Sequence, residues 1–240
     1  RGASASKYPY KDAIVEVDTY IGDVVQALEN AGELENTFIF VTSDNGPQMD
    51  SWPDSGYTPF RGAKGTTWEG GVRVPFIARW PGRIPEGSVN KNPAMTIDLF
   101  PMIAELTKSP LPEQKLDGMD IWPMFTKKNA QSQQEAYYIY YANSQLQAVI
   151  SGEWKLILPH KYRTMAGKPG GKDGIPNGYS ANVIKTPELY HLKTDVSEKK
   201  NLAEEKPDEL KRLLALAEKA YEDLGDGSLK RKGTGRRPVG

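Results

Sequence analysis

Residues 37–77, which read TFIFVTSDNGPQMDSWPDSGYTPFRGAKGTTWEGGVRVPFI, decide the fold. Residues 37–42 are a short run of β-branched and aromatic side chains, long enough for a strand and too short for a helix. Nearly continuous apolarity is typical of a strand that is buried on both faces of a mainly parallel sheet. A turn signal follows at residues 43–47, and open α/β sheets bind ligands beyond the carboxyl ends of their strands. Asp44 and Asn45 therefore stand where a ligand is expected.

Asp44 and Asn45 together offer a carboxylate oxygen and an amide oxygen. Such hard donors suit Ca²⁺ or Mg²⁺ better than zinc or copper, which prefer nitrogen or sulfur ligands. A calcium ion takes roughly 6–8 oxygens, so this pair predicts only part of a metal site. The alternative interpretation is that Asp-Asn-Gly serves only to make the turn.

A basic, glycine-rich segment follows at residues 61–65 (RGAKG), and residues 68–71 (WEGG) add two more glycines. Glycine lets the backbone approach a ligand closely, and Lys64 supplies a positive charge for an oxyanion. Residues 72–77 have the composition of a second strand. The pattern predicts an anion held between a metal and a lysine.

The segments 42–46 (TSDNG) and 60–82 (FRGAKGTTWEGGVRVPFIARWPG) resemble the second half of the sulfatases, of the arylsulfatase A and N-acetylgalactosamine-6-sulfatase type. The resemblance continues through TIDLFP, LDGMDIWP and ELYHLKTDVSEKKNL and covers nearly all of the chain. It implies an α/β fold containing part of an alkaline-phosphatase-like sheet sandwiched by helices. It also implies that Asp44 and Asn45 bind calcium, with magnesium less favoured, and that Lys64 is a catalytic residue contacting the sulfate.

The sulfatase family uses a formylglycine nucleophile, made from Cys or Ser in a C/S-x-P-x-R motif. The chain contains no cysteine, and the motif is absent. The further aspartates, histidine and lysines of the family's first half have no counterparts either. We therefore expect a fragment that is inactive alone and that needs the N-terminal half of the catalytic domain as its partner.

Composition sets further bounds. The chain has 240 residues, 38% of them hydrophobic, and a formal net charge of zero, which gives no field favouring nucleic acid or membrane. Arg1 is not a natural initiator, so we expect a processed, cloned or incomplete chain whose targeting segment is lost. Family resemblance implies a periplasmic, secreted or lysosomal-type location.

Three segments are predicted. Residues 1–134 are expected to be the C-terminal part of the sulfatase α/β domain, with an amphipathic helix over 11–30 that packs on the sheet and ends before Gly32. Asp98 is expected to be the N-cap of the next helix, with an active-site role as the alternative. Residues 135–228 are expected to form an α+β subdomain, and residues 229–240 a basic, flexible tail.

The subdomain is predicted from its β-type runs. These are 137–141, 146–150, 154–158 and 189–192, followed by a helix from Pro207 to Leu224. The runs indicate an antiparallel sheet with a helix packed against it.

Several single residues have open interpretations. The resemblance suggests His160 as a substrate or sulfate contact, whereas a loop histidine is more often locally bonded; His191 is expected to be structural.

Arg73 is expected to pair with Glu69 in a buried strand. Two loop aromatics, Trp52 and Tyr57, either line a pocket or pack the loop onto the body, and Arg61 faces either the pocket or solvent.

The expected ligand is a sulfate-ester small molecule or a sulfated glycan. Two alternatives remain: a phosphatase or phosphonate hydrolase of the same superfamily, which would need more histidines, and a non-catalytic module that binds sulfated glycans or partners. Nucleic-acid binding would need more than a short basic tail.

Overall fold

The computed structural model describes residues 9–52, 55–171 and 175–237. The chain divides into two compact units. Unit 1 contains residues 1–87 and 163–181, and unit 2 contains residues 88–162 and 182–240. The predicted boundary after residue 134 stays a prediction.

Unit 1 begins with the long helix α1 and continues into short elements. They are α1 (Pro9–Asn30), the 3₁₀ turn η1 (Leu34–Asn36), β1 (Ile39–Thr42), α2 (Glu69–Val72) and β2 (Phe76–Arg79). The predicted end of α1 is confirmed: Gly32 has a φ of +72° and donates its amide to the carbonyl of Glu29, while Glu33 donates to Leu28. These hydrogen bonds satisfy carbonyl groups in the last turn of α1 that would otherwise have no partner within the helix.

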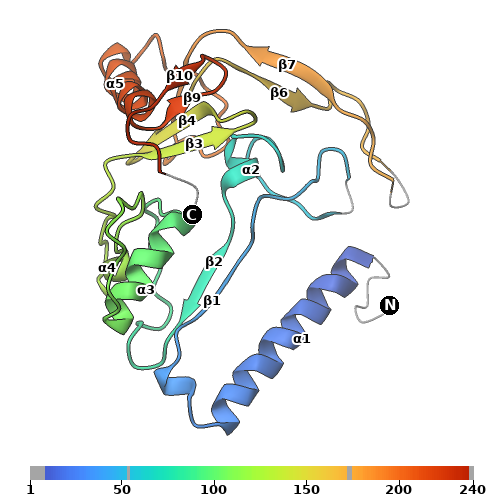
Figure 1. Ribbon diagram of the computed structural model, residues 1–240. Helices are drawn as coiled ribbons and strands as arrows, with labels where there is room; N and C mark the ends of the chain where they lie inside the picture. The colour runs from blue at the N-terminus through green and yellow to red at the C-terminus, as the bar shows by residue number, and fades with distance from the viewer. Residues whose placement is uncertain (1–8, 53–54, 172–174, 238–240) are drawn as a thin grey trace. The chain divides into compact units, whose positions relative to one another are not determined.

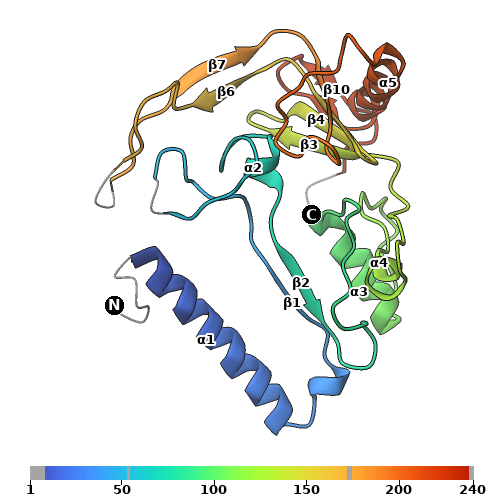
Figure 2. The ribbon, with the colours of Figure 1, turned by 180° about the vertical axis from the view of Figure 1, so that it is seen from behind.

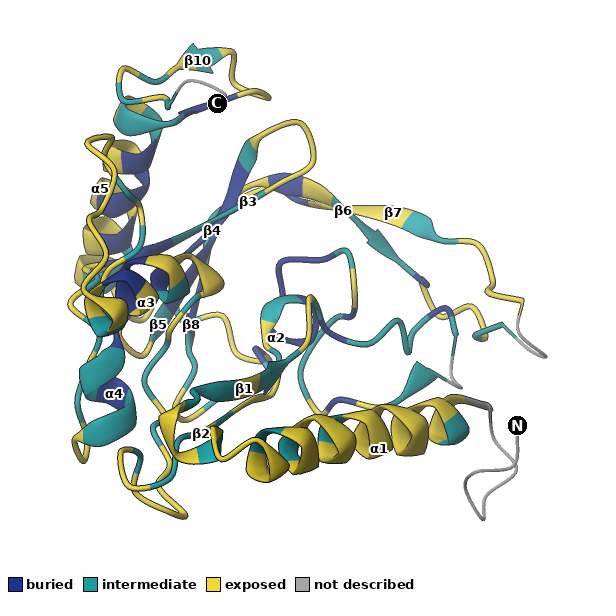
Figure 3. Cartoon of the chain, turned by 60° about the horizontal axis from the view of Figure 1, so that its bottom comes forward, coloured by how far each residue is buried: buried dark blue, intermediate teal, exposed yellow. Residues whose placement is uncertain are grey.

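The apolar stripe of α1 is largely exposed. Ile14, Val17 and Val24 are each more than half exposed, and most of the helix is coloured as exposed in Figure 3. The helix is therefore confirmed, but the predicted packing of its stripe on a sheet is not found among the described residues. No helix in the described ranges is long and apolar enough to cross a membrane.

The strands β1 and β2 form an antiparallel pair, with Ile39 opposite Arg79 and Thr42 opposite Phe76. Phe40 and Phe76 stack with ring centroids 5.5 Å apart, and both rings remain partly exposed. The expectation of a parallel strand buried on both faces is wrong for this pair, because within the described ranges β1 is paired only with β2. The predicted strand over 72–77 also starts later, since 69–72 is helical.

Unit 2 contains the four-stranded antiparallel sheet β3-β4-β5-β8. Figure 1 labels β3 and β4, and Figure 3 also labels β5 and β8. Its elements are η3 (Thr96–Asp98), α3 (Leu99–Thr107), α4 (Trp122–Thr126), β3 (Tyr137–Tyr141), β4 (Gln145–Ser151), β5 (Trp154–Ile157), β8 (Glu188–His191), α5 (Pro207–Asp223), β9 (Gly225–Asp226) and β10 (Arg231–Lys232). The core joins strand residues such as Val149 and Leu156 to Leu213 and Leu216 of α5. Both the predicted sheet and its packed helix are confirmed.

Strands β6 (His160–Thr164) and β7 (Ser180–Ile184) form a separate two-stranded ribbon, labelled in Figure 2. The sequence reasoning had not predicted this ribbon. Strand β6 (HKYRT) consists mostly of charged and polar residues, and β7 (SANVI) has only three apolar residues, so neither gives a strong apolar pattern.

Asp98 is fully buried and accepts hydrogen bonds from three parts of unit 2. Its carboxylate accepts from the amides of Met95 (3.1 Å) and Met119 (3.0 Å) and from the Tyr137 hydroxyl (2.6 Å). Burial, followed by this bond to Asp98, raises the pKa of Tyr137, so the hydroxyl is a donor at neutral pH. The predicted cap is corrected in part: Asp98 stands at the N-cap position of α3, but its side chain makes no bond to that helix. The carboxylate instead joins the segments around Met95 and Met119 to strand β3.

Replacing Asp98 with alanine should lower the unfolding free energy of unit 2 by about 3 kcal/mol, because buried donors would lose a charged acceptor. Thermal unfolding would measure this. Asp120→Ala is the matched control, since Asp120 is half-buried and its Oδ1 accepts a single bond, from the Trp122 amide. A loss for Asp98→Ala no greater than that of the control would contradict a joining role.

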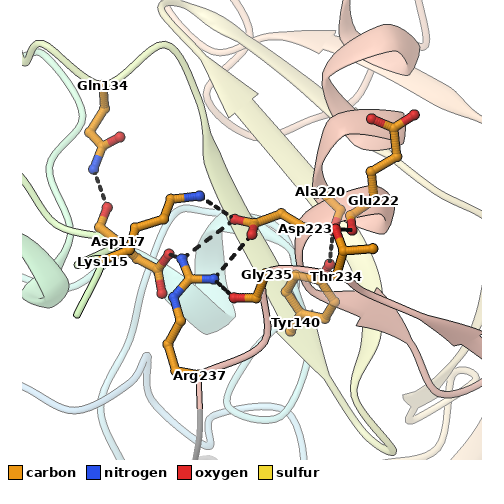
Figure 4. A network of polar contacts seen from close by, with 10 residues as sticks. All are labelled: Lys115, Asp117, Gln134, Tyr140, Ala220, Glu222, Asp223, Thr234, Gly235 and Arg237. Carbon is orange, nitrogen blue, oxygen red and sulfur yellow. Dashed lines mark hydrogen bonds and ion pairs between the residues drawn. The ribbon is translucent and has the colours of Figure 1, made fainter.

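The basic C-terminal segment is bonded to the rest of unit 2 as far as Arg237 (Figure 4). Arg237 forms ion pairs with Asp117 and Asp223, and Lys115 Nζ lies 2.7 Å from Asp223 Oδ2. The pKa of Asp223 is lowered, first by its bond to Lys115 and then by Arg237. Within residues 229–237, arginines therefore meet acidic side chains brought near by folding, whereas the flexible tail over 229–240 stays a prediction.

Candidate functional site

The candidate metal donors lie in the turn that leaves β1. Asp44 is exposed, and Ser43 donates its hydroxyl to Asp44 Oδ1 at 3.4 Å. The amide nitrogen of Asn45 donates to the Gly46 carbonyl at 3.0 Å, which leaves the amide oxygen to meet a cation. One exposed carboxylate and one amide oxygen suit a hard cation.

The loop that carries Lys64 is joined to this turn. The Lys64 amide donates to the Pro47 carbonyl at 3.0 Å, two residues beyond Asn45. Beside it, Ala63 is fully buried, and its carbonyl accepts from the amide (3.1 Å) and hydroxyl (2.8 Å) of Thr66. The Lys64 side chain is exposed. The backbone of the lysine is therefore fixed while its ammonium group is accessible.

Gly46 and the start of α2 pack backbone against backbone. The Gly46 amide donates to the Gly71 carbonyl at 2.9 Å, and a Cβ atom added at Gly46 would lie 1.8 Å from the Gly70 carbonyl oxygen. Only glycine fits such an approach. This contact fixes the Asp44–Asn45 turn against the segment that follows the lysine loop.

The two arginines of this region contact different neighbouring side chains. Arg61 lies over the buried Trp68 ring, 3.5 Å from its centroid, and its carbonyl accepts from the Gly70 amide at 2.7 Å. Arg73 pairs with Glu69 at 3.5 Å, which confirms the predicted partner. It is exposed and follows helix α2, so the prediction that it lies in a buried strand is wrong.

The sequence reasoning missed Arg163 and Tyr179, which also belong to unit 1. Arg163 donates to the carbonyl of Lys64 and lies over the Tyr179 ring. These residues are roughly a hundred positions from the lysine loop; Arg163 lies in the polar strand β6, and Tyr179 directly precedes β7. No spacing rule could have joined them to Lys64.

The histidines are both in unit 2. His160 is buried, and its Nδ1 lies 2.7 Å from the Leu158 carbonyl, so that nitrogen carries the proton. Burial lowers the pKa of His160, which favours a neutral ring whose Nε2 has no hydrogen-bond partner in the described ranges. A substrate contact by His160 stays a prediction. His191 bonds Thr194 and Glu153, as expected for a structural residue.

The two loop aromatics, Trp52 and Tyr57, differ in how far they are exposed. Tyr57 is 83% exposed, so it does not pack the loop onto the body, whereas Trp52 is half-buried and its amide donates to the Gln48 carbonyl.

A calcium ion fits the turn only in part. Within the described ranges, no group of three or more His, Cys, Asp or Glu side chains is arranged to hold a metal. Asp44 and Asn45 have the right oxygen donors but supply too few of them for the roughly 6–8 that calcium takes. The remaining donors would have to come from other residues.

Three family profiles match overlapping parts of the chain. They are sulfatase (residues 6–109), N-sulphoglucosamine sulphohydrolase, C-terminal (63–165), and C-terminal region of aryl-sulfatase (132–230). The first two overlap across the lysine loop described above.

The curated relatives that the chain matches are also sulfatases. Steryl-sulfatase of Mus musculus is 35% identical over 176 residues, which are 69% of this chain and 27% of that protein. N-acetylgalactosamine-6-O-sulfatase of Bacteroides thetaiotaomicron is 32% identical over 220 residues, 86% of this chain and 40% of that protein. The chain thus spans well under half the length of these curated relatives.

A solved structure shares the fold. The PsFucS1 sulfatase from Pseudoalteromonas sp. superposes with a TM-score of 0.77 at 32% identity, over 92% of this chain and 44% of that one. Arylsulfatase A and N-acetylgalactosamine-6-sulfatase are also among the relatives, which confirms the resemblance stated from the sequence motifs. By its profiles, its relatives and its partial alkaline-phosphatase-like fold, the chain belongs to the sulfatase family.

Proposed function

We propose that this chain is the C-terminal part of a calcium-dependent sulfatase that hydrolyses aryl or carbohydrate sulfate esters. Asp44 and Asn45 supply two of the calcium ligands, and Lys64 binds the sulfate. A formylglycine in an N-terminal segment of the same domain supplies the nucleophile, so the chain is inactive without that segment.

The hydrogen bond from the Lys64 amide to the Pro47 carbonyl carries the proposal. It ties the only lysine of the RGAKG loop to the turn that bears Asp44 and Asn45. Both segments lie in unit 1, so their proximity does not depend on unit 2. A cationic side chain beside two hard oxygen donors suits a sulfate that bridges a metal and an ammonium group.

The metal ion, Lys64 and Gly46 would each have a separate role in the reaction. A bound calcium would supply positive charge for the sulfate oxygens. Lys64 orients the sulfate, and its ammonium group donates a hydrogen bond to the oxygen on which charge develops as the S–O bond breaks. Gly46 keeps the two loops in contact, so these groups need no rearrangement during the reaction.

The exposed stripe of α1 supports the need for an N-terminal segment. Large apolar side chains on α1 and on the β1–β2 pair are open to solvent, including Ile14, Val24 and Ile77. Unburied apolar area of this kind marks an interaction surface. We assign it to the N-terminal part of the catalytic domain, because the chain spans only 27–40% of its curated relatives quoted above.

The substrate is proposed only as a class. The relatives' names cover steryl and N-acetylgalactosamine-6-O sulfates, and a solved relative, 25% identical, is titled as a complex with a neocarrahexaose. A sulfated glycan or a small sulfate ester both fit the exposed lysine. An exported or lysosomal-type compartment is part of the same proposal.

Co-producing the chain with the N-terminal segment of its parent gene tests the proposal. We expect hydrolysis of an aryl sulfate only when both parts are present, and about one calcium per complex by elemental analysis. Asp44→Ala should reduce bound calcium, and Asp18→Ala, on an exposed part of α1, should not. A complex that binds no calcium, or that hydrolyses phosphate esters but not sulfate esters, would contradict it.

A further inference from the structure

We propose that Arg163 is a positioning residue of the sulfatase site, which holds the Lys64 loop in place through the backbone. Its guanidinium donates to the carbonyl oxygen of Lys64 and lies over the ring of Tyr179, with Cζ 4.2 Å from the ring centroid. This inference rests on the proposed role of Lys64 and adds a residue outside the family motifs quoted above.

Gly65 creates the space that Arg163 fills. Its φ is +81°, and a Cβ atom added there would lie 2.4 Å from Cζ of Arg163. The guanidinium therefore lies directly against the backbone that follows the lysine. A side chain at position 65 would displace the arginine, so the glycine and the arginine act as a pair.

The position of Arg163 is itself set by Tyr179. The tyrosine hydroxyl oxygen lies 2.7 Å from Ser51 Oγ and 3.0 Å from Asp50 Oδ1. Burial is the main cause that raises the pKa of Tyr179, so the hydroxyl keeps its proton at neutral pH. Ser51 is fully buried, and its carbonyl accepts from the Gly171 amide at 2.6 Å.

Lys64 is thus held from two sides. Its amide is bonded to Pro47, beside the metal turn, and its carbonyl is bonded to Arg163. With both peptide groups fixed, the side chain starts from a defined point beside Asp44 and Asn45. Arginine suits this role because one planar group can stack on an aromatic ring and donate in its own plane, which a lysine ammonium cannot do.

A double-mutant cycle in the complete enzyme tests the inference. Arg163→Ala and Arg163→Lys should each lower kcat/KM for an aryl sulfate roughly 10- to 100-fold, because small displacements of a reacting group are costly. In a Lys64→Ala background, Arg163→Ala should change the residual rate less than about twofold, since a residue that acts through Lys64 has nothing left to position. Tyr179→Phe, which keeps the ring and loses the hydroxyl, should give a smaller loss than Arg163→Ala.

The matched control is Arg83→Ala. Arg83 also stacks on an aromatic ring, with Cζ 4.7 Å from the Trp80 centroid, and it is exposed. It should leave kcat/KM unchanged. Equal losses from Arg163→Ala in both backgrounds would show a general structural role and overturn the inference, as would full activity of Arg163→Lys. An unchanged rate for Lys64→Ala would instead overturn the proposed function.

Discussion

Replacing Lys64 with alanine in the complete sulfatase should lower kcat/KM for a sulfate ester roughly 100- to 1,000-fold, the usual cost of removing one donor to a developing oxyanion. The side chain is exposed, whereas its backbone is bonded to Pro47 and Arg163. Truncating the side chain therefore removes a charge without disturbing the loop. We expect the melting temperature to stay within about 2 °C, because exposed substitutions rarely shift stability much.

Steady-state kinetics together with thermal unfolding would check this. Lys128→Ala is the control, because Lys128 is an exposed lysine in the turn after α4 of unit 2. If Lys64→Ala and Lys128→Ala had equal rates, Lys64 would have no part in binding the reacting sulfate.

Replacing Gly46 with alanine should abolish both calcium binding and activity. The added methyl group would meet the Gly70 carbonyl oxygen at 1.8 Å, the Gly70 carbonyl carbon at 2.7 Å and the Gly71 Cα at 3.2 Å, all of them backbone atoms. Backbone cannot rotate aside as a side chain can, so the turn must separate from α2. We expect a loss of about 3 kcal/mol in stability, at the upper end for overpacking.

Gly22→Ala is the matched control for this substitution. Gly22 lies inside α1, and a Cβ atom there would meet nothing within 4 Å. Alanine in a helix interior should stabilise it by up to about 1 kcal/mol. Calcium content, melting temperature and activity would be compared for both variants. Native calcium binding by Gly46→Ala would mean that the contact with Gly70 does not position the metal donors.

Elements with a strong local pattern were predicted from the sequence. The stripe of α1, the β-type runs of β3, β4, β5 and β8, and the apolar spacing of α5 each indicated the correct type of element. The pairing of Arg73 with Glu69 was also predicted, although the buried strand from which it was inferred is wrong. These features depend on neighbours in the chain, which periodicity can detect.

Features that depend on distant contacts were not predicted. Asp98 resembled a helix cap, because its bonds to Met119 and Tyr137 come from residues that only folding brings near. The ribbon of β6 and β7 has only a weak apolar pattern. The ion pairs of the C-terminal basic segment, Arg231 with Glu218 and Arg237 with Asp223, join residues at least 13 positions apart, so composition did not indicate them. For the candidate site, the motifs supplied Asp44, Asn45 and Lys64, whereas Arg163 was visible only in the structure.

A crystal structure of the complete enzyme with bound sulfate would test the central claim most directly. We expect one sulfate with the Lys64 Nζ about 3 Å from an oxygen of that sulfate, as in a charge-assisted hydrogen bond. A calcium ion should lie about 2.4 Å from oxygens of Asp44 and Asn45 and contact the same sulfate. A sulfate bound elsewhere, with the Lys64 ammonium group pointing away from both donors, would contradict the account.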